Sequence, residues 1–255
     1  MNSALLIPAF LVLNLALALY LLHKLRKVHL ASYRIESTLN ALKDESDALF
    51  HQFQAYQALV QLIRPEKPLP PLRGWAASPD FLQHVASHVL AAAPRTIVEC
   101  GAGSSTVVLA YCCRANGQGR VFSLEHDPRH ARRVRRLLAA HGLDRWAWVV
   151  DAPLQADTEG GAPWYALDAL ELAEPIDLLV IDGPPAAIGA LARYPALPRL
   201  HGQLSARCHV FLDDAARPDE RAVVRRWLAE YPGFTAHDLP AEKGCVLLSP
   251  TGAGT

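Results

Sequence analysis

The sequence predicts a doubly wound α/β domain with a mostly parallel sheet, preceded by an apolar helix and a helical stalk. From Thr96 onward, short apolar runs alternate with helical patterns, and repeated strand–helix units form a parallel sheet covered by helices on both faces. An apolar run near the N-terminus and a heptad pattern after it account for the two preceding elements. We expect four parts: an anchor with a basic flank (residues 1–27), a coiled-coil-like stalk (28–64), a proline-rich linker (65–77) and the α/β domain (78–255).

The N-terminal run has the length and composition of a transmembrane helix. Ala4 to Leu22 is apolar except for Asn14, which is long enough to cross a hydrocarbon layer of about 30 Å. Basic residues follow this run (Lys24, Arg26, Lys27) and none precedes it, which predicts a single-pass protein whose C-terminal bulk is cytoplasmic. A cleaved signal peptide would carry its basic residues before the run. A helix buried in a larger assembly is the other alternative.

The stalk shows apolar residues in alternating steps of four and three, which is the heptad pattern of a coiled coil. The residues are Ile35, Leu39, Leu42, Leu49, Phe53, Tyr56, Val60 and Ile63, and Ser46 interrupts the series. The stripe needs a partner, which is either a second copy of the chain, giving a homodimer, or the α/β domain itself. Pro65 ends the pattern.

Seven short apolar runs after the linker read as strands. Five belong to the part of the chain where apolar runs alternate with helical patterns, and they are expected to be parallel: 96–100, 120–124, 146–150, 176–181 and 208–212. The last two, 234–239 and 244–248, are joined only by Pro240–Lys243, so they must form an antiparallel hairpin.

The first strand ends in a turn that is suited to a ligand. Open sheets of this class bind ligands beyond the C-terminal ends of their strands, and Gly101 and Gly103 allow close approach of the backbone. Thr106 stands where a dinucleotide-binding turn would have its third glycine, which disfavours a nicotinamide-dependent oxidoreductase. Glu99 suits an ammonium group better than a phosphate. Glu125, at the end of the second strand, is placed to accept hydrogen bonds from ribose hydroxyls.

The order of these residues, with Asp151 and Asp182 after later strands, resembles the motifs of class I S-adenosylmethionine-dependent methyltransferases over residues 92–249. The resemblance implies S-adenosylmethionine as cofactor, with Glu99 and the glycine turn at its methionine part, Glu125 at the ribose, and Asp151 and Ala152 at the adenine. The full set of implied cofactor-binding residues is Glu99, Gly101, Gly103, Ser104, Ser105, Glu125, His126, Asp151, Ala152 and Asp182.

Three carboxylates are expected to meet at neighbouring strand ends. Asp182 follows the fourth strand, and Asp213 and Asp214 follow the fifth. Clustered carboxylates need donors, a shared proton or a cation, and an oxygen-rich site suits Mg²⁺, Mn²⁺ or Ca²⁺. The arrangement is similar to metal-dependent O-methyltransferases of the catechol type, although those have Asp-Asn where this chain has Asp-Asp. Alternatively, Asp213 and Asp214 cap the helix that begins near Pro218 or face water.

The sequence thus predicts methyl transfer to a hydroxyl of a small, lipid-linked or glycan-linked acceptor at the cytoplasmic membrane face, with Asp182 and Asp214 as catalytic candidates. His126 and His201 are further candidates for the base, and the acceptor pocket is expected around Trp75, residues 157–170 and Arg193. The balance of 25 basic and 25 acidic residues gives no support for a nucleic-acid ligand. The alternative is a membrane-anchored interaction protein whose methyltransferase-like domain has lost catalysis.

Overall fold

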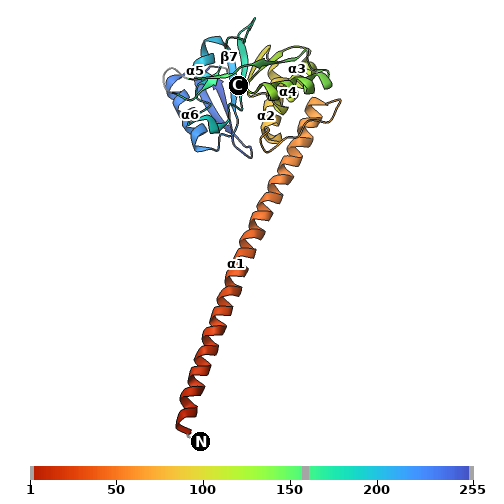
Figure 1. Cartoon of the computed structure of the whole chain (residues 1–255). Coiled ribbons are helices and arrows are strands. Elements are labelled where there is room, and N and C mark those ends of the chain that lie inside the picture. Colours follow the sequence, from red (N-terminus) through yellow and green to blue (C-terminus); the bar gives the residue numbers. More distant parts are fainter. Residues whose placement is uncertain (1–2, 157–160, 253–255) are drawn as a thin grey trace. The chain divides into compact units, whose positions relative to one another are not determined.

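A computed structural model describes residues 3–156 and 161–252 of the chain (Figure 1). The chain divides into two compact units, Met1–Phe50 and His51–Thr255. Helix α1 (Ser3–Ile63) supplies all of the described first unit and also the first residues of the second. Each unit is described by itself below.

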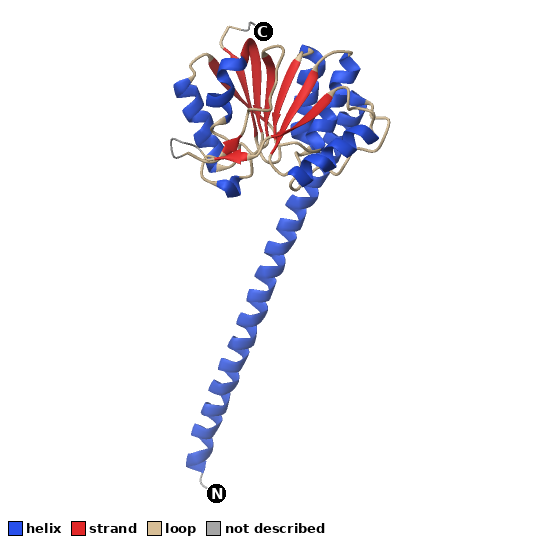
Figure 2. Ribbon diagram, turned by 45° about the horizontal axis from the view of Figure 1, so that its top comes forward, coloured by secondary structure: helices blue, strands red, loops and turns tan. Residues whose placement is uncertain are grey.

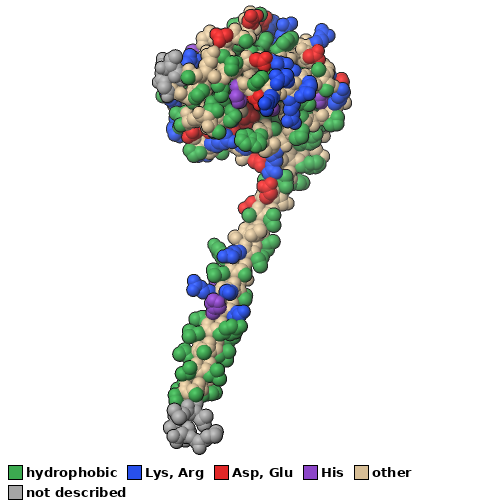
Figure 3. Space-filling view, in the orientation of Figure 1, with side chains coloured by type: hydrophobic (Ala, Val, Ile, Leu, Met, Phe, Trp, Pro, Cys, Tyr) green, Lys and Arg blue, Asp and Glu red, His purple; other side chains and the backbone are tan. Residues whose placement is uncertain are grey.

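The first unit is a continuous helix with an apolar N-terminal part. Apolar side chains surround it from Ile7 onward, and the basic residues Lys24, Arg26 and Lys27 follow (Figure 3). Asn14 donates its amide to the carbonyl of Phe10 at 2.8 Å, so the polar side chain in this part is satisfied within its own helix. Within the described residues, α1 is the one helix that is long and apolar enough by composition to cross a membrane.

The last turns of α1 pack into the second unit through a face that the heptad pattern did not predict. The buried residues are Ala55, Leu59 and Ile63, and only Ile63 belongs to the predicted stripe. Phe53 of that stripe is 55% exposed. The buried face is fixed by Gln52, which donates to Asp80 Oδ2 at 2.7 Å, a contact that a heptad pattern cannot anticipate.

The second unit is built on a seven-stranded sheet in the order β3-β2-β1-β6-β7-β9-β8 (Figure 2). The first five strands in this order are parallel, and β9 is antiparallel to both β7 and β8. The strands are β1 (Thr96–Cys100), β2 (Arg120–Glu125), β3 (Ala147–Asp151), β6 (Ile176–Ile181), β7 (Leu204–Leu212), β8 (Phe234–Leu239) and β9 (Cys245–Pro250). The predicted doubly wound α/β sheet with an antiparallel C-terminal hairpin is confirmed.

Helices cover both faces of this sheet because successive strand residues alternate between two apolar cores. One core joins Ile97, Val121 and Phe211 to the end of α1, α2 (Pro79–Ala92), α3 (Ser104–Asn116) and α4 (Pro128–Ala140). The other joins Val98, Leu124 and Leu212 to α5 (Ala196–Leu200) and α6 (Pro218–Glu230).

Several short elements were not predicted because they are too short to show a periodic pattern. Strand β4 (Leu154–Gln155) pairs with β5 (Trp164–Tyr165), and the 3₁₀ turns η1 (Ala186–Ile188) and η2 (His201–Gln203) flank α5. Residues 157–160 of the expected acceptor region 157–170 lie outside the described residues.

Candidate functional site

The candidate site lies at the C-terminal ends of β1, β2, β6 and β7, which are consecutive neighbours in the sheet. Strand order alone therefore brings Glu99, Glu125, Asp182 and Asp213 to one edge. This is the edge where doubly wound sheets bind ligands.

Glu99 is fully buried at the end of β1 and is held by hydroxyl groups. Its Oε2 accepts a hydrogen bond from Thr106 Oγ1 at 2.6 Å and another from Ser123 Oγ of the neighbouring strand. Its other oxygen, Oε1, is buried and has no hydrogen-bond partner among the described residues. Burial raises the pKa of Glu99 to about 7, against the lowering effect of the hydroxyl donors. A buried carboxylate with one free oxygen suits a cationic partner.

Thr106 explains why this turn has no third glycine. Its hydroxyl accepts the N–H of Gly103 at 2.9 Å while it donates to Glu99, so a single side chain ties the turn to the buried carboxylate. In the sequence, Thr106 was significant only as the position where a third glycine is missing. The signal for its role was the position of its hydroxyl, about one helical turn after Gly103, where it can bind both the glycine turn and Glu99.

The two glycines of the turn differ in why glycine suits their positions. Gly101 has φ +97°, and a Cβ at this position would lie 3.2 Å from the backbone oxygen of Asp182, so glycine is required by both backbone conformation and packing. Gly103 is extended, and a Cβ there would meet only Ser105 Oγ, at 3.9 Å. The space beside Gly103 is thus open to a bound molecule.

The two serines of the turn differ in their contacts. Ser104 donates to the carbonyl of Pro71 at 3.0 Å and so holds the linker against the turn. Ser105 is buried near Glu99, and its hydroxyl lowers the pKa of that carboxyl. Ser105 therefore belongs to the support of Glu99.

Glu125 ends β2 beside the glycine turn and is almost completely buried. Its Oε1 accepts the N–H of Asp127 at 2.8 Å and lies 3.2 Å from His126 Nδ1. The backbone contact fixes one oxygen and leaves the other for a hydroxyl donor.

Asp151 and Ala152, the residues implied at the adenine, are in contrasting surroundings. Asp151 is largely exposed and its Oδ1 forms an ion pair with Arg135 at 2.8 Å. Ala152 is buried, and its N–H donates to the carbonyl of Glu125 at 2.8 Å. The loop after β3 is therefore tied directly to the end of β2.

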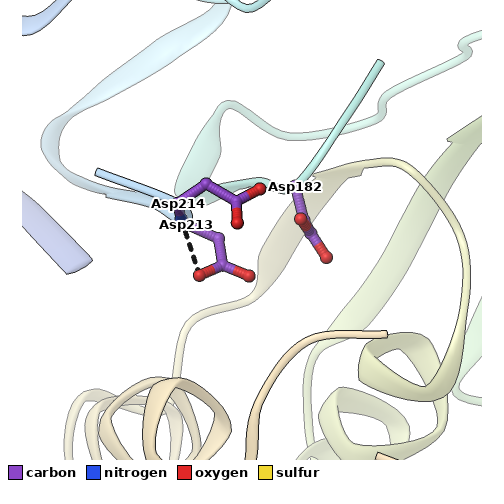
Figure 4. A group of neighbouring side chains, drawn as sticks. All are labelled: Asp182, Asp213 and Asp214. Atoms are coloured by element: carbon purple, nitrogen blue, oxygen red, sulfur yellow. Dashed lines mark hydrogen bonds between the residues drawn. The ribbon is translucent and has the colours of Figure 1, made fainter. Parts of the chain in front are cut away.

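The three carboxylates come together as expected (Figure 4). A buried arginine, Arg193, joins them. One ligand oxygen from each of Asp182, Asp213 and Asp214 lies within 4.8 Å of the others. Arg193 Nη2 lies 2.6 Å from Asp214 Oδ2 and 3.2 Å from Asp182 Oδ1, and its Nη1 donates to the backbone oxygen of Asp213 at 2.7 Å. The sequence placed Arg193 only at an acceptor pocket, whereas it is a cation within the carboxylate cluster.

The cluster carries more negative than positive charge. Glu220 lies 3.8 Å from Arg193 Nε, and Arg217 pairs with Asp214 at 2.9 Å. Four carboxylates against two arginines leave a formal charge of −2, which the charge of Lys243 partly offsets. The described residues offer no hydrogen-bond donor to Asp213 Oδ2 or Asp214 Oδ1, although both oxygens are buried. These free oxygens and the residual charge fit a divalent cation.

The electrostatics of the cluster reflect this imbalance. Burial, reinforced by Asp213 and Asp214, raises the pKa of Asp182 well above its ordinary value. Burial and Asp214 raise the pKa of Asp213 to about 6. Asp214 also has φ +57°, a conformation that Asp tolerates better than most residues and that occurs often at functional sites.

The remaining residues that the sequence predicted for the acceptor pocket or the base differ in their surroundings. Trp75 is 96% exposed, and the ring of His201 packs at a tilt against that of Tyr231, with centroids 4.5 Å apart. Tyr165, within the expected acceptor region 157–170, is buried at the site: a Cβ on Gly183 would lie 2.6 Å from its hydroxyl oxygen.

The raised pKa of Glu99 predicts a pH dependence of stability. In the folded chain the Glu99 carboxyl keeps its proton up to about pH 7, whereas the ordinary pKa of a glutamate is 4.5. The stabilisation is thus full below the ordinary value and is lost as the pH rises through 7, by on the order of 3 kcal/mol. Glu99→Gln should flatten this part of the pH profile in urea unfolding, and the exposed Glu171→Gln should leave it unchanged. A profile that Glu99→Gln does not alter contradicts the prediction.

Comparisons with known proteins agree with this geometry. Residues 98–215 match a family described as a methyltransferase domain. No curated protein sequence matches the chain. The SAH-bound methyltransferase PaMTH1 of Podospora anserina aligns over 76% of this chain and 88% of its own, with 19% identity and a TM-score of 0.54.

Two further solved structures are similar to the chain. The Bacillus cereus O-methyltransferase in complex with SAH aligns over 78% of this chain and 91% of its own, with 21% identity and a TM-score of 0.53. The Streptomyces achromogenes O-methyltransferase TomG in complex with SAM aligns over 79% of this chain and 89% of its own, with 18% identity and a TM-score of 0.51. The second unit therefore has the Rossmann-like methyltransferase fold.

Proposed function

We propose that this chain is an S-adenosylmethionine-dependent O-methyltransferase. The observation that supports it most is the pair of buried carboxylates at the tips of β1 and β2: Glu99 has one unpartnered oxygen and Glu125 has one oxygen fixed by the backbone. An ammonium group and a ribose diol are the complementary groups. The methyltransferase-domain match and the fold shared with SAH- and SAM-bound enzymes agree with this cofactor.

The residues of the site have two roles, cofactor binding and activation of the acceptor hydroxyl. Glu99 and the turn at Gly103 bind the methionine part of the cofactor, and Glu125 orients its ribose. Bound S-adenosylmethionine supplies an electrophilic methyl group on a sulfonium. Asp182 or Asp214 would accept the proton of the acceptor hydroxyl and so prepare its oxygen for methylation.

In this proposal a divalent cation would assist at the acceptor hydroxyl. Asp182, Asp213 and Asp214 would hold it, because Asp213 and Asp214 each retain a free buried oxygen and the cluster keeps a formal charge of −2 beside its two arginines. When bound, such a cation lowers the pKa of a coordinated hydroxyl. Arg193 keeps Asp182 and Asp214 in place.

The acceptor is proposed to be a small, lipid-linked or glycan-linked hydroxyl compound, reached from the cytoplasmic membrane face through a single-pass α1 anchor. The support is the apolar start of α1 and the basic residues after it. Extraction of membranes with alkaline carbonate tests the anchor: the chain should stay with the lipid. Release into the soluble fraction contradicts the anchor without bearing on the cofactor.

Cofactor binding and transfer are tested separately. Isothermal titration of the full chain in detergent should show S-adenosylmethionine binding in the micromolar range, and absence of heat and of thermal stabilisation contradicts the proposal. Transfer of a labelled methyl group into the lipid or glycan fraction of a lysate separates an enzyme from a binding protein that has lost catalysis. Binding without any transfer favours the latter.

Metal assistance gives its own prediction. Removing divalent cations with EDTA should reduce an established transfer activity by at least about tenfold, as expected for loss of a cation that activates a hydroxyl, and Mg²⁺ should restore it. Asp213→Asn should weaken Mg²⁺ binding measured by titration without cofactor. Activity that EDTA does not change contradicts the metal and leaves the methyltransferase assignment intact.

A further inference from the structure

The side chain of Tyr165 crosses the strand ends at the proposed cofactor site. Its ring lies beside that of His126, which follows β2, with the two centroids 6.1 Å apart. At its other end, a Cβ on Gly183, in the loop after β6, would lie 2.6 Å from the phenol oxygen. The same Cβ would lie 3.2 Å from both the Cα of Gly101 and the carbonyl oxygen of Cys100. The hydroxyl of Tyr165 is therefore at the ends of β1 and β6, next to the glycine turn.

The short β4–β5 hairpin holds Tyr165 in this position. Tyr165 pairs with Leu154 across the hairpin, and its ring packs edge-on against that of Trp164, with centroids 5.1 Å apart. The hairpin begins just after Ala152, whose N–H donates to the carbonyl of Glu125 at the end of β2. The backbone that carries Tyr165 is thus tied to the sheet, and the fold itself sets the position of the hydroxyl.

The phenol hydroxyl of Tyr165 has no partner in the described part of the chain. The residue is 3% exposed, and across residues 3–156 and 161–252 its hydroxyl makes no hydrogen bond. The buried phenol oxygen of Tyr111, by contrast, lies 2.7 Å from His141 Nδ1. Buried polar groups in folded proteins are almost always hydrogen-bonded. A phenol without a partner, at the edge where this class of sheet binds ligands, therefore indicates that a bound molecule is its partner.

The surroundings of Tyr165 keep its phenol protonated. Burial raises the pKa of Tyr165 well above its ordinary value, and the carboxylates of Glu125 and Asp182 raise it further. The side chain is therefore a neutral phenol near neutral pH. It offers an oxygen lone pair to a cationic group and does not act as a base.

The covalent structure of the proposed cofactor determines which of its groups would meet this hydroxyl. In S-adenosylmethionine the sulfur is bonded to the ribose, to the methionine chain and to the transferable methyl group. The proposed ribose ligand, Glu125, ends β2, and the proposed methionine site is the turn after β1. Since the Tyr165 hydroxyl adjoins this turn and its ring adjoins the end of β2, the group nearest to it would be the sulfonium that joins the two parts. Carbon atoms attached to a sulfonium share its positive charge and form C–H···O contacts with oxygen acceptors.

We propose that the phenol oxygen of Tyr165 contacts the sulfonium of bound S-adenosylmethionine and thereby favours the charged cofactor over its neutral product, S-adenosylhomocysteine. The product lacks both the positive charge and the methyl group, so it cannot make the same contact. The preference would limit inhibition by the product. The inference rests on the proposed cofactor, and it does not depend on the identity of the acceptor.

The test compares the affinities of the full chain, in detergent, for S-adenosylmethionine and S-adenosylhomocysteine. Tyr165→Phe removes only the hydroxyl and keeps the ring that packs against Trp164 and His126. The variant should lower the ratio of the two affinities by about fivefold, the size expected for the loss of one or two C–H···O contacts. The change should come from a higher Kd for S-adenosylmethionine, with the Kd for S-adenosylhomocysteine little altered. Isothermal titration of wild type and variant with each molecule measures all four values.

A matched variant controls for the loss of a buried phenol. Tyr111→Phe removes the same atom from α3, where the hydroxyl contacts His141, and should leave the ratio of affinities unchanged. An unchanged ratio in Tyr165→Phe, an equal change in both variants, or equal weakening of both molecules overturns this inference and leaves the cofactor assignment intact. A wild-type chain that binds neither molecule contradicts the proposed function, and the inference fails with it.

Discussion

Replacing Arg193 by methionine is expected to lower the free energy of unfolding by about 3–5 kcal/mol, the usual result of removing one partner of a buried ion pair. Arg193 is 3% exposed and contacts Asp182, Asp214 and the backbone of Asp213, so its loss leaves buried carboxylates without their main counter-charge. Chemical unfolding of wild type and variant at neutral pH measures the difference.

The chain offers a matched control for this prediction. Arg207 forms a two-bond ion pair with Asp177, both contacts at 3.0 Å, but its side chain is 66% exposed. Arg207→Met should therefore cost no more than about 1 kcal/mol. Arg193→Lys retains the charge but cannot span three acceptors, so it should recover only part of the loss. Equal effects of Arg193→Met and Arg207→Met contradict the assignment of Arg193 as the central cation of the cluster.

Replacing Glu125 by alanine is expected to weaken S-adenosylmethionine binding by at least about 100-fold, because hydrogen bonds to a charged acceptor contribute about 1.5–3 kcal/mol each. The carboxylate is buried at the end of β2 and its position is fixed by the N–H of Asp127. Isothermal titration of both proteins with S-adenosylmethionine measures the change in Kd.

Two further variants separate cofactor binding from local structure. Glu125→Gln keeps an acceptor for Asp127 and should lose less affinity than Glu125→Ala, because only the charge is removed. Glu230→Ala, on the opposite face of the sheet, should leave the affinity unchanged. Unaltered binding in Glu125→Ala, with normal thermal unfolding of the cofactor-free protein, excludes this residue as the ribose ligand.

The sequence by itself determined that the sheet is mostly parallel with an antiparallel C-terminal hairpin, and at which edge of the sheet the site lies. Alternating apolar runs and helical patterns require a parallel sheet, and a four-residue connection requires an antiparallel hairpin. Glu99, Glu125, Asp182 and Asp213 follow from this directly, since they occupy strand ends. Local patterns suffice to locate these four residues, because each apolar run shows where its strand ends. The C-terminal ends of parallel strands then lie at one edge of the sheet.

Only the tertiary structure decided which loop residues complete the site. Arg193 lies in a segment without a periodic pattern, 11 residues after Asp182 and 21 before Asp214, and its contacts depend on how the loop after β6 folds back. The buried face of α1 was likewise decided by a contact between Gln52 and Asp80. The contacts of loop side chains depend on long-range packing, which their spacing along the sequence does not predict.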